Sequence, residues 1–212
     1  MINTFINEYN KLFAHHISKS MLMKGSQNSY SRYLPKAFKV QINRASIQSS
    51  SDKYIEEVKW GKGNNMAIAI GLNPSQSLPY NLDKTNELVT YAIYKSPNSY
   101  DGYYLMNLYS RLQTAGFLPG NIVDQAEVIK NAINIYTLCN NIINIDIILF
   151  FGSSFYVTNR TLKELNEIAN ASFKTIGNGT KLHHHPGRCV CHKSITINGR
   201  GNSIVLTNHY YK

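Results

Sequence analysis

The sequence lacks the features that mark several common protein classes. It has three cysteines, Cys139, Cys189 and Cys191, too few for a disulfide framework or an iron–sulfur cluster held by cysteines alone. No apolar run is long enough to span a bilayer and the N-terminus lacks a secretory layout, so we expect a cytoplasmic protein without membrane contact. Walker A, Gly-x-Gly-x-x-Gly and Gly-x-Ser-x-Gly motifs are missing, which disfavours P-loop, dinucleotide-binding and serine-hydrolase chemistry.

Acidic side chains are also scarce. The chain has 12 Asp and Glu against 22 Lys and Arg, a formal net charge of +10. The excess lies in two flanks, since residues 1–65 and 151–212 each carry +6 while residues 66–150 carry −2. Two basic flanks around a slightly acidic centre favour a polyanionic partner, and we expect DNA, although scattered surface lysines that only aid solubility would give the same count.

What is present is an alternation of short apolar runs with segments of helical periodicity. This alternation predicts an α/β fold, with three α/β/α layers around a central, mainly parallel four-stranded sheet. The predicted strands cover residues 66–70, 102–108, 146–151 and 173–176, and the predicted helices cover residues 83–95, 123–141 and 161–169.

The remaining segments are assigned from weaker patterns. Residues 1–52 are interpreted as an N-terminal helix, over residues 2–20, followed by a basic and aromatic extension of loop with one or two short strands. Residues 53–212 form the predicted α/β domain, which opens with an edge strand or short helix over residues 53–60. A hairpin turning near Asn198 and Gly199 is expected within residues 195–207.

Polar side chains follow the predicted strands, where open α/β sheets place ligand chemistry. Asn73 stands between Leu72 and Pro74 after the first strand, and it could position a water molecule or simply form the turn. Asn107 ends the second strand, and its planar carboxamide matches the edge of a pyrimidine, although a loop-capping role is equally ordinary. His185 could donate a hydrogen bond to a developing oxyanion.

The residues around His185 also allow a metal interpretation. Three adjacent histidines are followed by Cys189, Cys191 and His192, which invites a structural zinc site or a zinc-dependent nuclease. Adjacent histidines cannot easily all face one ion, and the gap between the two cysteines is shorter than zinc sites usually have. We therefore expect no metal and no cofactor.

The motifs taken together resemble the uncharacterised DUF1643 family, over roughly residues 54–190. Members of that family occur beside recombinase genes in mobile cassette elements. The resemblance rests on Gly71-Leu72-Asn73-Pro74-Ser75, Asp83-x-Thr85, Leu105-x-Asn107-Leu108-Tyr109-Ser110-Arg111, Phe150-x-Gly152 and His185-Pro186.

The same order of motifs is similar to that of the uracil-DNA glycosylase superfamily. This resemblance implies a glycosylase-like fold and excision of uracil from DNA, with Asn73 positioning the attacking water, Asn107 reading the uracil edge and His185 stabilising the uracil anion. It also implies substrate contacts from Gly71, Leu72 and either Tyr80 or Tyr109, and DNA contacts from Ser75, Ser77, Gly187 and Arg188. A DNA-mimicking inhibitor protein is a further conceivable partner.

Two departures from the superfamily pattern keep an alternative open. Asn73 stands where the most active glycosylases have Asp, and Gly187-Arg188-Cys189 replaces the familiar Ser-Pro-Leu. A catalytically weak or inactive DNA-binding protein of a mobile element would carry the same motifs, and uracil excision is the property that separates the two hypotheses.

Overall fold

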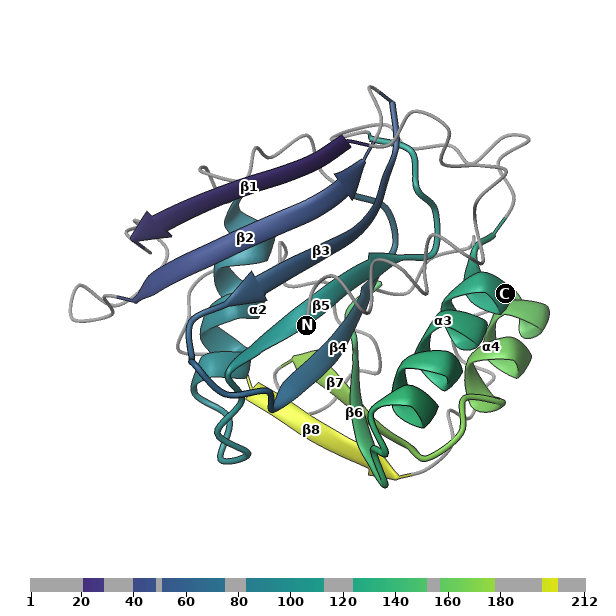
Figure 1. The fold of residues 1–212 in the computed structure, drawn as a ribbon. Helices are drawn as coiled ribbons and strands as arrows, with labels where there is room; N and C mark the ends of the chain where they lie inside the picture. The colour runs from purple at the N-terminus through teal and green to yellow at the C-terminus, as the bar shows by residue number, and fades with distance from the viewer. Residues whose placement is uncertain are drawn as a thin grey trace.

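The chain folds around one large mixed sheet in a computed structural model, which describes residues 21–28, 40–48, 51–74, 83–112, 124–151, 157–177 and 196–201 (Figure 1). The α/β class predicted from the sequence is confirmed. The strands are β1 (Met21–Asn28), β2 (Gln41–Gln48), β3 (Lys53–Lys59), β4 (Met66–Gly71), β5 (Gly102–Asn107), β6 (Ile145–Leu149), β7 (Ala171–Gly177) and β8 (Thr196–Gly201), and the helices are α2 (Lys84–Tyr94), α3 (Ala126–Cys139) and α4 (Asn159–Asn166).

The four predicted strands form the parallel centre of this sheet. β5 and β6 flank β4, β7 lies next to β6, and all three pairings are parallel. The sheet is larger than the predicted four strands, because its order is β1-β2-β3-β5-β4-β6-β7-β8, with antiparallel strands added at both sides. The predicted strand number is therefore wrong, since the count of four left out strands from the weaker-patterned segments, which lack the long apolar runs typical of parallel strands.

The added strands correct three local predictions. β3 is an internal strand between β2 and β5, not an edge strand or a helix. β1 and β2 confirm the two strands allowed within residues 21–52, and they belong to the same sheet as the predicted domain. β8 runs straight through Asn198 and Gly199, which pair with Thr175 and Lys174, so the turn expected there is wrong. The predicted helix over residues 2–20 lies outside the described residues.

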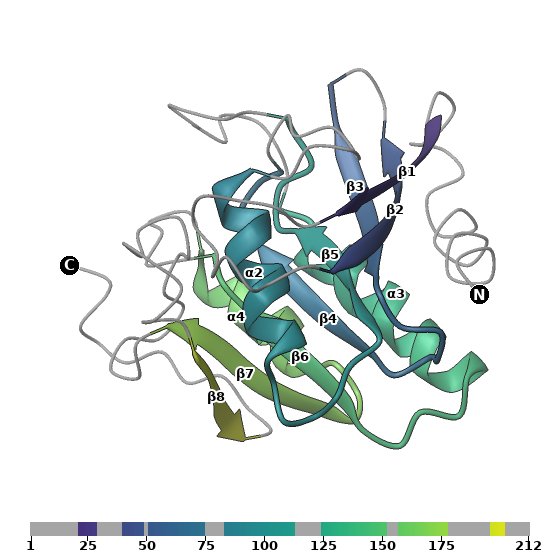
Figure 2. The same cartoon turned by 90° about the vertical axis from the view of Figure 1, so that its left-hand side faces the viewer.

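Helices cover both faces of the sheet, as Figures 1 and 2 show. On one face, alternate residues of β4, β5 and β6 pack against α3 and α4; on the other, the intervening residues pack against α2. β4 has all six residues buried, as expected for a strand covered on both sides. None of the described helices is long and apolar enough to cross a membrane.

A buried ion cluster joins β2 to β3 on the face that α2 covers. The Glu56 carboxylate lies against the Arg44 guanidinium, and its Oε2 is 3.3 Å from the Lys53 Nζ. The Arg44 and Glu56 side chains are almost fully buried, so their mutual pairing is needed to offset the cost of removing charge from water. This cluster anchors the antiparallel part of the sheet beside the parallel centre.

A second polar cluster lies at the amino ends of the parallel strands. Asp146 Oδ2 accepts hydrogen bonds from Lys174 Nζ and Asn98 Nδ2, each at 2.7 Å, and from the Tyr100 hydroxyl. Burial alone would raise the pKa of Asp146, but these three donors together hold it below its ordinary value. Burial is also the main cause of the raised pKa of Tyr100, which therefore remains a neutral donor.

We predict that Asp146→Asn destabilises the fold by about 1.5–3 kcal/mol at neutral pH, because three donors lose a charged acceptor. A carboxylate whose folded pKa is depressed stabilises the fold above its unfolded pKa of about 3.9, and that stability is lost as pH falls through the folded pKa. Urea unfolding at several pH values should therefore show a weaker acid dependence in Asp146→Asn than in the wild type. Glu127→Gln, at an exposed carboxylate, is the control; equal acid dependence in all three proteins would contradict the prediction.

Candidate functional site at the carboxyl ends of the parallel strands

The carboxyl ends of β4 and β5 bring four of the predicted site residues together. Gly71 pairs with Asn107 in the parallel register. The contact continues past the strands, because Leu108 N donates to Gly71 O at 3.0 Å and Tyr109 N donates to Leu72 O at 2.8 Å. The segments 71–72 and 107–109 therefore lie side by side at the edge where an α/β sheet places its ligands.

The Asn107 side chain is a nearly buried polar group at this edge. Asn107 is 6% exposed, yet among the residues that the structure describes its carboxamide has no hydrogen-bond partner. Neither Oδ1 nor Nδ2 of Asn107 is among the fully enclosed side-chain atoms that lack a partner, so the carboxamide keeps some contact with solvent at this edge. An unpaired carboxamide that keeps access to solvent at this edge can meet a ligand that presents a matching donor and acceptor.

Gly71 makes room for the Asn107 side chain. A methyl group at position 71 would lie 2.6 Å from Asn107 Oδ1 and 2.9 Å from two carbons of the Phe150 ring. Phe150 follows β6, is 4% exposed and packs on the α2 side of the sheet. Gly71 is thus explained by close packing around Asn107, a role that the sequence motif alone did not identify.

The other predicted residues at this edge occupy different surroundings. Asn73 is half-buried, two residues beyond the end of β4. Tyr109 is 5% exposed and its side chain belongs to the core on the α3 and α4 side, whereas Asn107 follows the alternation of Tyr103 and Leu105 toward α2. Phe150 lies on the same face of the sheet as Asn107, unlike Tyr109, and its ring borders the space at Gly71 that Asn107 Oδ1 also borders.

Six predicted site residues fall outside the described part of the chain: Ser75, Ser77, Tyr80, His185, Gly187 and Arg188. The histidine and cysteine cluster at residues 183–192 falls there too. Across the described ranges, no group of histidine, cysteine and carboxylate side chains is arranged to hold a metal ion.

Helices α2, α3 and α4 each follow a parallel strand, so their N-termini all lie at this edge. Asp83 caps α2 by accepting from Asn86 N at 2.8 Å. Gln125 N, at the start of α3, donates to Leu108 O at 2.7 Å and ties that helix to the end of β5. The positive ends of three helix dipoles therefore face the edge that holds Asn107, an arrangement that favours anions.

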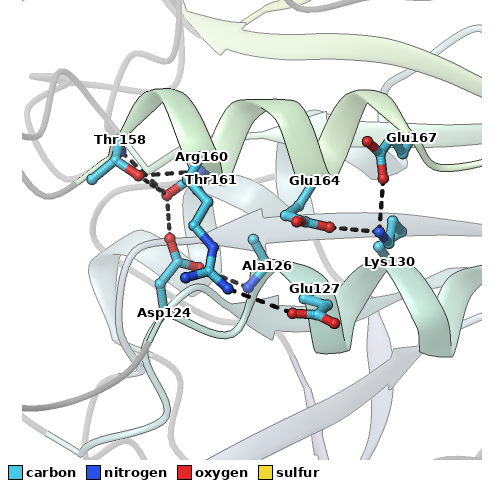
Figure 3. Close-up of polar contacts among 9 residues, drawn as sticks. All are labelled: Asp124, Ala126, Glu127, Lys130, Thr158, Arg160, Thr161, Glu164 and Glu167. Carbon is cyan, nitrogen blue, oxygen red and sulfur yellow. Dashed lines mark hydrogen bonds and ion pairs between the residues drawn. The ribbon is translucent and has the colours of Figure 1, made fainter.

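Asp124 joins the beginnings of α3 and α4, as Figure 3 shows. Its Oδ1 accepts from Ala126 N at 2.7 Å, and its Oδ2 accepts from the Thr161 hydroxyl. Thr161 also forms a capping box with Thr158 at the start of α4. Sequence reasoning missed this link, although an acidic residue just before one helix and two threonines at the start of the next were visible signals.

Further along, salt bridges connect α3 and α4, and some of these are more buried than others. Lys130 Nζ lies 2.5 Å from Glu164 Oε2 and 2.9 Å from Glu167 Oε2, and these hydrogen bonds raise the pKa of Lys130 (Figure 3). Arg160 and Glu127 are 3.7 Å apart and mostly exposed, so their contribution should be small. The helix pair is therefore fixed mainly at its N-terminal end and along its inner side.

We expect Gly71→Ala to displace Asn107 or Phe150 and to destabilise the fold by about 1–3 kcal/mol, the usual cost of overpacking. Urea unfolding would measure the stability, and the side-chain amide signals of Asn107 in an NMR spectrum would report the displacement. Gly63→Ala is the control, because its methyl group would meet Asp101 at the opposite edge. Asn107 signals that move no more in Gly71→Ala than in Gly63→Ala would refute this explanation of Gly71.

We also expect Asp124→Ala to cost about 1–3 kcal/mol, because the Ala126 amide and the Thr161 hydroxyl lose their shared acceptor. Glu127→Ala, which removes a carboxylate from the first turn of the same helix, should change stability by no more than about 0.5 kcal/mol. Urea unfolding of both variants makes the comparison, and equal destabilisation would show that Asp124 does not link the helices.

Comparison with known proteins gives a family but no activity. A search of the curated proteins finds no significant match. The family model described as "Protein of unknown function (DUF1643)" matches residues 53–187, which include Gly71, Asn73, Asn107, Phe150 and His185. Because this match covers more than half of the sequence, the chain belongs to the DUF1643 family.

Proposed function

We propose that the chain is a uracil-DNA glycosylase-like enzyme that hydrolyses the N-glycosidic bond of uracil in DNA. The observation that carries the proposal is the buried Asn107 carboxamide, which lies at the carboxyl end of a parallel strand with no hydrogen-bond partner in the described part of the chain. A carboxamide can donate to O4 of uracil and accept from its N3–H. A buried group of this kind suits a ligand that presents both atoms on one edge.

The proposed reaction requires the base to leave the DNA stack, because a duplex hides its edge and its glycosidic bond. The C1′–N1 bond breaks with its electron pair going to the base, which leaves an oxocarbenium-like sugar and a uracil anion. Water positioned by Asn73 adds through its oxygen to C1′, and the proton that it loses balances the charge of the departing base. The products are free uracil and an abasic sugar, and no metal or cofactor takes part.

The other residues named from the sequence have supporting roles in this proposal. His185 donates a hydrogen bond to the uracil anion, and the helix N-termini at the same edge also favour negative charge there. The basic flanks bind DNA phosphates, together with Ser75, Ser77, Gly187 and Arg188. Gly71 contributes to substrate binding indirectly, because it leaves space for the Asn107 side chain.

The test is single-turnover excision from an oligonucleotide with one uracil, beside a matched oligonucleotide with cytosine. Wild-type protein should release uracil and leave an alkali-labile abasic site. Asn107→Asp should lose about 10⁴-fold in this rate, because a carboxylate offers only acceptors to the O4 of uracil. The same variant should gain affinity for cytosine, whose amino group can donate to the new carboxylate.

Asn131→Asp is the matched control for that variant, because it adds the same charge at an exposed position on α3. It should keep wild-type excision, and both variants should still bind DNA. Uracil release by Asn107→Asp at the wild-type rate would remove Asn107 from the site, and a wild-type protein that releases no uracil would overturn the proposed function.

A further inference from the structure

A carboxamide alone does not distinguish uracil from cytosine. Uracil presents an acceptor at position 4 and a donor at N3, while cytosine presents a donor at position 4 and an acceptor at N3. An asparagine that turns its amide by 180° exchanges its own donor and acceptor within nearly the same volume. Selective recognition by Asn107 therefore needs a contact that fixes which end of the amide carries the oxygen.

The structure places one aromatic ring near the Asn107 oxygen, on the β4 and β6 side of Asn107. Asn107 Oδ1 lies 2.6 Å, and two carbons of the Phe150 ring lie 2.9 Å, from the point that a methyl group on Gly71 would occupy. The oxygen and these ring carbons are therefore at most 5.5 Å apart, the sum of the two distances. The two ring carbons, Cε2 and Cζ, belong to the outer edge of the ring.

The electrostatics of this arrangement favour the oxygen over the amide nitrogen. The edge of an aromatic ring is positive, so it attracts a carbonyl oxygen and repels an N–H donor. With the amide turned over, the nitrogen would face the ring edge and would have no acceptor there, which leaves a buried donor unsatisfied. Gly71 is needed for the same reason, because any side chain at this position would separate the oxygen from the ring.

We propose that Phe150, across the gap left by Gly71, locks the Asn107 carboxamide with its oxygen toward β4 and β6, and thereby sets the preference for uracil over cytosine. Phe150 is a positioning residue in this account, since it acts on the base through Asn107. The proposal rests on the proposed function of Asn107 as the group that reads the base, and it adds the residue that makes this reading selective.

The test compares substitutions of two buried phenylalanines on opposite faces of the sheet. Phe150→Leu keeps an apolar side chain of similar size but removes the positive ring edge. Phe173→Leu is the matched control, because Phe173 on β7 is fully buried in the core on the α3 and α4 side. Thermal unfolding of both variants would show that each is folded and how far each is destabilised.

The readout is inhibition of uracil excision by free uracil and by free cytosine, which compares binding of the two edges without requiring cytosine to leave a sugar. Wild type and Phe173→Leu should be inhibited much more strongly by uracil. In Phe150→Leu the preference for uracil, given by the ratio of the two inhibition constants, should fall by about 10-fold to 100-fold. The reason is that a carboxamide free to turn can match the hydrogen-bonding edge of either base. A folded Phe150→Leu with the wild-type ratio would overturn the inference while leaving uracil excision itself intact.

An NMR measurement on the wild-type protein covers the case in which Phe150→Leu does not fold. The side-chain amide protons of Asn107 should show no magnetisation transfer to the Phe150 ring, because the oxygen occupies that side. Strong transfer between them would overturn the lock. A wild-type protein that excises no uracil would overturn the proposed function and the lock with it, so the two failures give different results.

Discussion

The parallel pairing of β4 with β5 is the constraint on which the site depends. This register places Gly71 opposite Asn107 and brings their following segments together through two further backbone hydrogen bonds. Because side chains alternate between the faces of a strand, a slip of one residue would turn Asn107 away from α2 and away from Phe150. The β4–β5 pairing therefore accounts together for the burial of these strands, the glycine at position 71 and the low exposed fraction of Asn107.

Polar side chains at the two ends of the parallel strands differ in their hydrogen-bond partners. At the amino ends, the Asp146 carboxylate receives donors from Lys174, Tyr100 and Asn98, so that cluster has its partners within the fold. At the carboxyl ends, Asn107 is as buried as Tyr100 but has no such partner among the described residues. The Asn107 carboxamide keeps access to solvent and is free to meet a ligand, so this contrast supports the proposed recognition role of Asn107.

The sequence was sufficient for the parallel centre of the fold and for part of the site. The apolar run of β4, the helical spacing of α2 with its Asp83 cap, and Asn107 at the end of β5 were all legible from local patterns. β2 and β3 were harder to recognise, because the buried pair Arg44 and Glu56 replaces apolar residues by charges whose pairing appears only when the strands meet.

Other features were hidden because they depend on contacts between distant segments. The Asn-Gly pair of β8 has the local pattern of a hairpin turn, and only its pairing with β7 makes it a continuous strand. Phe150 stands in a recognisable motif, but its role follows from the approach of β6 to Gly71 and Asn107. Local sequence carries no signal for a contact that joins three strands at one point.

The central claim, that Asn107 reads the edge of uracil, is tested most directly by titrating the ¹⁵N-labelled protein with free uracil and following the Asn107 side-chain amide by NMR. The account predicts that uracil shifts these signals, as the amide nitrogen gains the carbonyl oxygen at position 4 as an acceptor, while cytosine at the same concentration does not. Asn107 signals that stay unchanged at saturating uracil, or that respond equally to cytosine, would contradict it.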